Sequence, residues 1–204
     1  MKNKNLIIFD VDGVLLDSKT NMEVSWAYVM EQLNISTPFE DYFALIGRPF
    51  KDIIKHLNLM RKYDEIEKCY FDASILGLKD AIFYENVKSV LMVLEKMGKT
   101  LAIATSKDAE RTQIIVDQMP VKFSLVQTPN DKLRGKPAPD HLLYILANLN
   151  FDPSEAVYIG DMATDAEAAR RAGIDYIHAE WGYGDKNFLY KNSIANVSEL
   201  INYL

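Results

Sequence analysis

The sequence has a single cysteine, less positive than negative charge, and few glycines or prolines outside short segments. Cys69 cannot form an internal disulfide bond, which is typical of a chain that works in a reducing compartment. Acidic residues outnumber basic ones by 29 to 23, a formal net charge of −6. This is the wrong sign for a surface that neutralises phosphate backbones. We therefore expect no nucleic acid as the main partner.

Long apolar runs are also missing. No uncharged apolar stretch approaches the about 20 residues that a membrane span needs. The first segment has only four consecutive apolar residues, Leu6 to Phe9, before Asp10, too few for the core of a signal peptide. We expect a cytoplasmic protein that has no membrane partner.

What the chain does have is enough apolar residues for a substantial core. It contains 204 residues, of which 49% are hydrophobic and 25% charged, close to the globular average. This length predicts one main core and at most a small insertion. Nothing in the sequence distinguishes a monomer from a homodimer.

Short apolar runs alternate with helical patterns along most of the chain. The apolar runs predict buried strands, and the intervening segments repeat apolar residues at i, i+3, i+4 and i+7, as Val87, Val90, Leu91 and Leu94 do. Such alternation predicts an α/β fold, a doubly wound, mostly parallel sheet with a Rossmann-like core. The expected strands are 6–9, 101–104, 123–126, 157–159 and 174–177.

One region breaks the alternation. Between Ser18 and Tyr84 there is no convincing strand, only helical patterns interrupted by Pro38 and by Gly47-Arg48-Pro49. We interpret residues 18–84 as an inserted all-helical subdomain. The main α/β core is then discontinuous, formed by residues 1–17 and 85–204.

Two pairs of aspartates follow predicted strands. Asp10 and Asp12 end the first strand in FDVDGVLLDS, and Asp161 and Asp165 follow the strand at 157–159. Each pair has a structural explanation, the first as a polar turn and the second as a helix N-cap with an acidic first turn. The carboxyl edge of a parallel sheet would, however, gather both pairs in one place. We expect Asp161 and Asp165 to share a helix face.

Three further residues stand near the same predicted edge. Thr105 and Ser106 close the strand at 101–104 and either cap the next helix or bind a phosphate oxygen. Lys136 lies in the loop RGKPAPD. Four converging carboxylates are chemically reasonable only with cations among them, so we expect Mg²⁺, which prefers oxygen ligands, together with Lys136.

Gly182-Tyr183-Gly184 matches the first two glycines of the dinucleotide-binding motif G-x-G-x-x-G. It lacks the third glycine of a dinucleotide fingerprint and comes late in the chain. We do not interpret it as a nucleotide site.

Taken in order, FDVDGVLLDS, IATSK, RGKPAPD and IGDMATD resemble the four motifs of the haloacid dehalogenase superfamily. The resemblance covers nearly the whole chain, and the helical insertion is similar to the cap of the phosphoglycolate phosphatase and beta-phosphoglucomutase-like branch. It implies a Mg²⁺-dependent phosphatase that acts on a small phosphorylated metabolite.

The resemblance also implies a role for each residue. Asp10 would be the nucleophile that becomes an aspartyl phosphate, and Asp12 the general acid and base. Thr105 and Lys136 would hold the transferring phosphoryl group. The metal ligands would be a carboxylate oxygen of Asp10, the main-chain carbonyl of Asp12 and the carboxylate of Asp161, with Asp165 supporting them.

Three alternatives stay open. A phosphomutase of the beta-phosphoglucomutase type usually has Glu-Asp where this chain has Gly160-Asp161. A receiver-like signalling module uses similar residue types but needs an aspartate after a middle strand, where this chain has Thr105. A non-catalytic phosphate-binding relative would lack catalytic positions, and none is missing here.

Charge predicts one contact from the insertion. The four carboxylates and a phosphoryl dianion outweigh Mg²⁺ and Lys136, so a further cation is wanted. Arg48, in the turn Ile46-Gly47-Arg48-Pro49, could grip an anionic leaving group in a bidentate fork. Its structural alternative is an exposed arginine that stabilises a turn.

Overall fold

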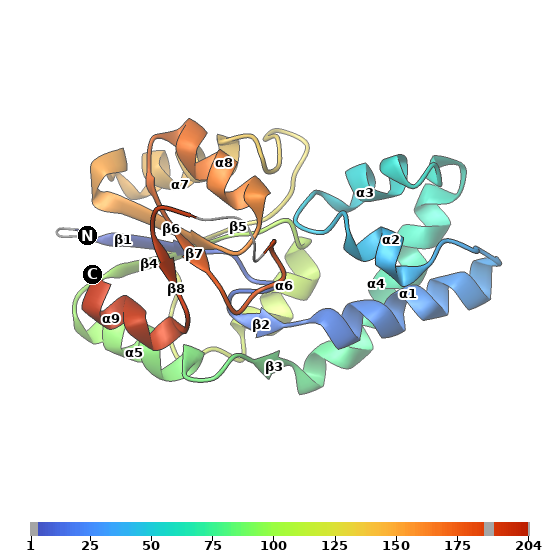
Figure 1. Ribbon diagram of the computed structural model, residues 1–204, viewed down its shortest axis with the longest axis horizontal. Helices are drawn as coiled ribbons and strands as arrows, with labels where there is room; N and C mark the ends of the chain where they lie inside the picture. Colours follow the sequence, from blue (N-terminus) through green and yellow to red (C-terminus); the bar gives the residue numbers. More distant parts are fainter. Residues whose placement is uncertain (1–3, 186–189, 204) are drawn as a thin grey trace.

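The computed structural model describes residues 4–185 and 190–203, and its main element is a six-stranded, wholly parallel sheet (Figure 1). The strands run in the order β5-β4-β1-β6-β7-β8. Their bounds are β1 (Leu6–Phe9), β4 (Thr100–Ala104), β5 (Leu125–Gln127), β6 (Ala156–Gly160), β7 (Asp175–Ala179) and β8 (Ser193–Ile194). The expected doubly wound α/β core is confirmed.

Helices cover both faces of this sheet. Ile7 and Phe9 pack on one face with α5 (Val87–Lys96), α6 (Ala109–Val116) and α9 (Leu200–Tyr203). Leu6 and Ile8 pack on the other face with α7 (Asp140–Leu149) and α8 (Ala163–Ala172). All four β1 side chains are fully buried, because successive residues of a strand point to opposite faces and both faces are covered.

Between β1 and α5 the chain leaves the sheet and forms a separate group of helices, seen at the right of Figure 1. We call residues 18–84 the helical insertion. Its helices are α1 (Lys19–Leu33), α2 (Phe39–Phe43), α3 (Phe50–His56) and α4 (Tyr63–Gly77), with short 3-10 turns at Met60–Lys62 and Leu78–Asp80. They enclose a hydrophobic cluster of their own, which includes Trp26, Ile54 and Ile66.

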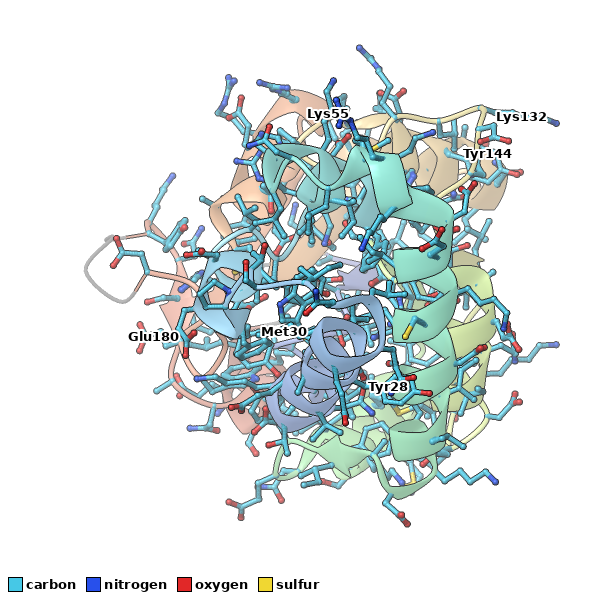
Figure 2. All side chains as sticks on the ribbon, turned by 90° about the vertical axis from the view of Figure 1, so that its right-hand side faces the viewer. Tyr28, Met30, Lys55, Lys132, Tyr144 and Glu180 are labelled. Carbon is cyan, nitrogen blue, oxygen red and sulfur yellow. The ribbon has the colours of Figure 1, made fainter. Side chains whose placement is uncertain are left out.

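Sequence signals account for the breaks in the insertion. Pro38 and Pro49 stand at the N-cap positions of α2 and α3, since a proline is tolerated at the start of a helix. Figure 2 views the molecule from this side, with Tyr28 and Met30 of α1 in front. No helix in the described parts of the chain is long and apolar enough to cross a bilayer.

Three elements differ from the sequence expectation. The insertion is entered and left through a two-stranded antiparallel ribbon, β2 (Leu16–Asp17) and β3 (Ile82–Phe83), so the prediction of no strand between residues 18 and 84 is wrong at 82–83. The two-residue strand β8 was also not predicted, and β5 begins at Leu125 instead of 123. Elements this short show no periodicity, so tertiary pairing alone defines them.

The return from the ribbon into the core needs a tight turn. Asn86 takes a left-handed conformation, with φ of 64°, at the N-cap position of α5. Asparagine adopts this region more readily than other residues that carry a Cβ. The turn thus forms without glycine.

The strand order locates the functional edge. β1 lies between β4 and β6, and the chain continues outward from β1 first through β4 and β5 and later through β6 to β8. The order therefore reverses at β1. In open α/β sheets a ligand binds outside the carboxyl ends of the strands at such a point, and Asp10 is the residue that follows β1.

Candidate active site

Asp10 lies at the centre of the sheet edge. Its main-chain N–H donates to Ile159 O at 2.9 Å, which extends the pairing of β1 with β6 by one residue. Its carboxylate is 4% exposed. Lys136 Nζ lies 2.9 Å from Asp10 Oδ2, whereas Oδ1 has no hydrogen-bond partner in the described parts of the chain. Burial raises the pKa of Asp10 to about 6, against the opposing effect of Lys136.

Asp161 follows β6 and is fully buried beside Asp10. Its Oδ2 accepts a 2.7 Å hydrogen bond from the main-chain N–H of Tyr183. Among residues 4–185 and 190–203, no donor reaches its Oδ1. Burial, reinforced by Asp165 and Asp10, raises the pKa of Asp161 well above the ordinary value. A buried carboxylate with a free oxygen favours a bound cation.

Asp165 and Lys136 form the second layer of the cluster. Lys136 Nζ lies 2.7 Å from Asp165 Oδ1 and donates to Tyr158 Oη at 3.2 Å. With Asp10, these contacts use the three protons of the ammonium group. Burial by itself lowers the pKa of Lys136, but Asp10 and Asp165 outweigh it and hold that pKa above the ordinary value. The lysine thus remains charged.

The helix after β6 differs from the expectation. It begins at Ala163 with Met162 at the N-cap position. Asp161 therefore precedes the helix, so the prediction of a shared helix face is wrong, and the structural alternative of a helix cap does not apply to Asp161. Asp165 Oδ2 accepts from Met162 N at 2.9 Å. The carboxylates converge nevertheless: ligand atoms of Asp10, Asp161 and Asp165 lie within 4.8 Å of one another.

Asp12 does not join this cluster. A tight turn follows it, with Gly13 at φ of 81°, and its carboxylate points to a different partner. Lys107 Nζ lies 3.1 Å from Asp12 Oδ1, an ion pair without the alignment of a hydrogen bond. Burial lowers the pKa of Lys107, and Asp12 opposes this. Lys107 is the residue that the sequence interpretation missed, although it ends the quoted motif IATSK.

The hydroxyl residues after β4 have different surroundings. Thr105 is buried, and its Oγ1 accepts from Lys107 N at 3.2 Å, which leaves the hydroxyl proton for another acceptor. Ser106 Oγ donates to Gly47 O at 3.0 Å, across to the helical insertion. Neither caps α6, because Asp108 does so by accepting from Arg111 N.

A cavity of about 50 Å³ lies between the core and the insertion. The core side is formed by Asp10, Asp12, Thr105, Ser106, Lys107, Arg111, Met162 and Tyr183, and the insertion side by Met22, Tyr42, Ile46, Gly47, Arg48, Phe50, Ile53 and Tyr70. Lys136, Asp161 and Asp165 are absent from this lining because they lie behind Asp10. The cavity has space for roughly four water molecules.

Two arginines line the cavity, and they differ in exposure and in the partners of their side chains. Arg48 is exposed, and no ion pair or hydrogen bond of its side chain is found within the described residues. Arg111 is buried, pairs with Asp108, donates to Ser74 Oγ at 3.2 Å and stacks over Phe71. The structure brings Arg48 to the cavity, and its role as a substrate contact stays a prediction.

The cluster fits a hard metal ion on its own chemistry. Asp161 keeps one buried oxygen, Oδ1, with no partner in the portion described, and such an orphaned acceptor is expensive unless a cation or donor meets it. An all-oxygen donor set is typical of Mg²⁺ and similar cations. The arrangement can hold a divalent cation next to a free carboxylate oxygen that faces a small cavity.

Comparison with known families gives one match over most of the chain. Residues 7–179 match the family described as haloacid dehalogenase-like hydrolase. The tyrosine-protein kinase PtkA of Mycobacterium tuberculosis is 28% identical over 202 residues, which cover 97% of this chain and 69% of that protein. The phosphoglycolate phosphatase of Aquifex aeolicus is 27% identical, over 87% of this chain and 85% of that protein.

Solved structures share the fold over the full length. A predicted phosphoglycolate phosphatase from Haemophilus somnus superimposes with a TM-score of 0.87 at 20% identity, covering 100% of this chain and 99% of that one. A haloacid dehalogenase-like hydrolase from Streptococcus pneumoniae gives a TM-score of 0.85 at 21% identity, with the same coverage. At 20–21% identity these two structures show that the fold of the core and of the insertion is shared, and nothing beyond the fold.

Proposed function

This chain belongs to the haloacid dehalogenase-like hydrolase family, and from that premise we propose that it is a Mg²⁺-dependent phosphatase that hydrolyses a small phosphorylated metabolite through an aspartyl phosphate on Asp10. One observation carries the proposal. Asp10 has one oxygen fixed by Lys136 and the other without a partner in the described residues, at the floor of the cavity. A nucleophile needs this combination of fixed orientation and a free lone pair.

Asp161, the main-chain carbonyl of Asp12 and the Asp10 oxygen that does not attack the substrate would hold the Mg²⁺. When bound, the ion supplies positive charge that stabilises the oxygens of the transferring phosphoryl group. Charge supports this assignment: with all four aspartates of the motifs ionised, one divalent cation together with Lys136 and Lys107 offsets them in full. A bound phosphoryl dianion still leaves the site net negative, so Lys107 adds to the cation sought from Arg48 and does not replace it.

In the first step, Asp10 Oδ1 attacks the phosphorus atom, forming an oxygen–phosphorus bond as the bond to the leaving oxygen breaks. With a pKa of about 6, Asp10 is mostly ionised at neutral pH. The Asp12 carboxyl group, on the cavity wall, donates a proton to the leaving alcohol oxygen. Thr105 donates its free hydroxyl proton to a phosphoryl oxygen.

In the second step, the Asp12 carboxylate takes a proton from water, and that water attacks the phosphorus atom of the aspartyl phosphate. Inorganic phosphate leaves, and the Asp10 carboxylate is restored. Lys107 keeps Asp12 in place through both steps. Because Asp12 stays within reach of the leaving alcohol oxygen and of the attacking water, it can act first as the acid and then as the base.

The substrate we propose is a small phosphate ester whose leaving group carries an anionic group, such as a carboxylate. The volume of about 50 Å³ favours a small metabolite, and Arg48 reaches the cavity with no counter-ion in the described residues. The name of the phosphoglycolate phosphatase relative is consistent with this class.

The test is a screen of phosphorylated metabolites, with Mg²⁺ and with excess chelator. We expect release of inorganic phosphate from small anionic esters, loss of turnover on chelation, and recovery on addition of Mg²⁺. Undiminished turnover in chelator would overturn the metal assignment. Isomerised sugar phosphate without free phosphate would overturn the hydrolase in favour of a mutase.

A further inference from the structure

We propose that Tyr183 is a positioning residue that couples the entry of the helical insertion to Asp161. The inference rests on the proposed function only in that it assigns Mg²⁺ to Asp161. Tyr183 lies in the segment 180–184, which we call the clasp; Glu180, which begins it, lies at the left edge of the molecule in Figure 2. The Gly-Tyr-Gly sequence within the clasp had no role in the sequence analysis.

On its inner side the clasp packs closely against Asp161 through its main chain. The main-chain N–H of Tyr183 donates to Asp161 Oδ2 at 2.7 Å, which fixes the carboxylate plane and leaves Oδ1 for a cation. The flanking glycines approach too closely for any side chain. A Cβ on Gly182 would lie 2.3 Å from Asp161 Cβ, and one on Gly184 would lie 1.9 Å from Asp161 O.

On its outer side the same tyrosine holds the start of α1. Its hydroxyl accepts from Ser18 N at 2.6 Å and from Lys19 N at 3.1 Å, and donates to Asp17 Oδ1 at 2.9 Å. Ser18, at the N-cap position, makes no side-chain cap of its own. The Tyr183 hydroxyl therefore accepts from two of the main-chain N–H groups at the start of α1 that have no intrahelical partner.

The clasp also contacts the segment by which the chain returns to the core. Trp181 Nε1 donates to Val14 O at 3.1 Å, and its ring packs edge-on against Tyr84 at 6.3 Å between centroids. The Tyr183 ring packs in the same manner on Phe43 of α2, at 5.4 Å. The clasp thus contacts the segment by which the chain enters the insertion, the segment by which it returns to the core, and the insertion itself.

Because one residue binds Asp161 and the start of α1, a change at either end alters the free energy of the other. Coupling of this kind is reciprocal. Metal binding at Asp161 therefore protects the amides of Ser18 and Lys19 from exchange, and loosening the start of α1 weakens metal binding.

The test compares the full-length protein with Tyr183→Phe, which removes the hydroxyl and keeps the ring and the main-chain N–H. Mg²⁺ binding is measured by calorimetry without substrate, and amide exchange at residues 18 and 19 is measured with and without Mg²⁺. We expect the Mg²⁺ Kd to rise about fivefold, at the lower end of the usual coupling between two sites, and the Mg²⁺-dependent protection of residues 18 and 19 to disappear.

Two further variants sharpen the result. Asp17→Ala removes the acceptor of the Tyr183 hydroxyl, and we expect it to weaken Mg²⁺ binding with no additional loss in the double variant. Gln118→Met is the matched control. Gln118 Nε2 also joins core to insertion, donating to Leu78 O at 3.0 Å, but it is remote from Asp161. We expect it to lower Tm and leave the Mg²⁺ Kd unchanged.

The outcomes separate the two proposals. A wild-type protein that binds no Mg²⁺ overturns the metal assignment of the proposed function, and the coupling with it. If the wild type binds Mg²⁺ and Tyr183→Phe binds it equally well, with protection intact, the proposed function stands and Tyr183 is only structural. An equal loss in Gln118→Met would likewise overturn the coupling.

Discussion

The two sides of the cavity are built by different means. On the core side Asp10 lines the cavity, and it is backed by Lys136, Asp161 and Asp165; all four are at most 5% exposed and are fixed by ion pairs, hydrogen bonds or both. On the insertion side the lining is aromatic and aliphatic, and Arg48 is exposed. Rigid placement suits groups that must meet a reacting atom, whereas a separately packed helical layer can vary without disturbing them.

If the core side performs the chemistry, the largest loss follows from Asp10→Asn. The amide is a poor nucleophile, so we expect no turnover above background on any phosphate ester. Steady-state phosphate release checks this, with thermal unfolding as evidence that the variant folds. Residual turnover within a hundredfold of the wild type would contradict the assignment of the nucleophile.

A smaller loss is expected from Asp12→Asn, since Asp10 stays intact. General acid–base catalysis contributes about 100- to 10,000-fold, or roughly 3 to 5 kcal/mol of barrier. The measurement is kcat on an alkyl phosphate, whose leaving oxygen needs a proton. Near-native turnover there would show that another group acts as the acid.

Lys107→Met tests whether the ion pair with Asp12 belongs to the chemical machinery. Because the substitution removes the positive charge that holds Asp12, we expect kcat to fall by one to two orders of magnitude, or roughly 1.4 to 2.7 kcal/mol of barrier. Lys55→Met is the control, because Lys55 is exposed on α3 and directed outward (Figure 2). Equal effects of the two substitutions would remove Lys107 from the site.

The insertion side is tested by Arg48→Ala, with the smallest expected effect. We expect kcat/KM to fall about tenfold, or ~1.4 kcal/mol, on an anionic metabolite and to change little on an aryl phosphate with a neutral leaving group. Arg61→Ala, an exposed arginine of the same insertion, serves as the control. Equal losses on both substrates would return Arg48 to a surface role.

The contrast between the two sides also explains what the sequence could predict. Strand ends such as Asp10 and Asp161 follow apolar runs that periodicity detects, and a parallel sheet brings those ends together. The ribbon strands Leu16–Asp17 and Ile82–Phe83 are too short for any period. The helical insertion was visible because its patterns differ from strands over more than sixty residues.

The sequence could not predict which side chains of the site contact one another. Lys107 pairs with Asp12, whose carboxylate lies outside the acidic cluster. Tyr158, a buried strand residue, contacts Lys136 and Asp165 through its hydroxyl, and its sequence context resembles any core tyrosine. Such contacts depend on which strands become neighbours, which no local pattern encodes.

The central claim is that Asp10 carries the phosphoryl group during turnover, and trapping that group tests it most directly. The protein is mixed with its best substrate and Mg²⁺, quenched in acid within one turnover, and treated with borohydride, which reduces an acyl phosphate to an alcohol. Peptide sequencing by mass spectrometry then locates the change. We predict homoserine at position 10 in the substrate-treated sample and unmodified Asp10 in the substrate-free control. Reduction at another residue, or none during active turnover, would contradict the account.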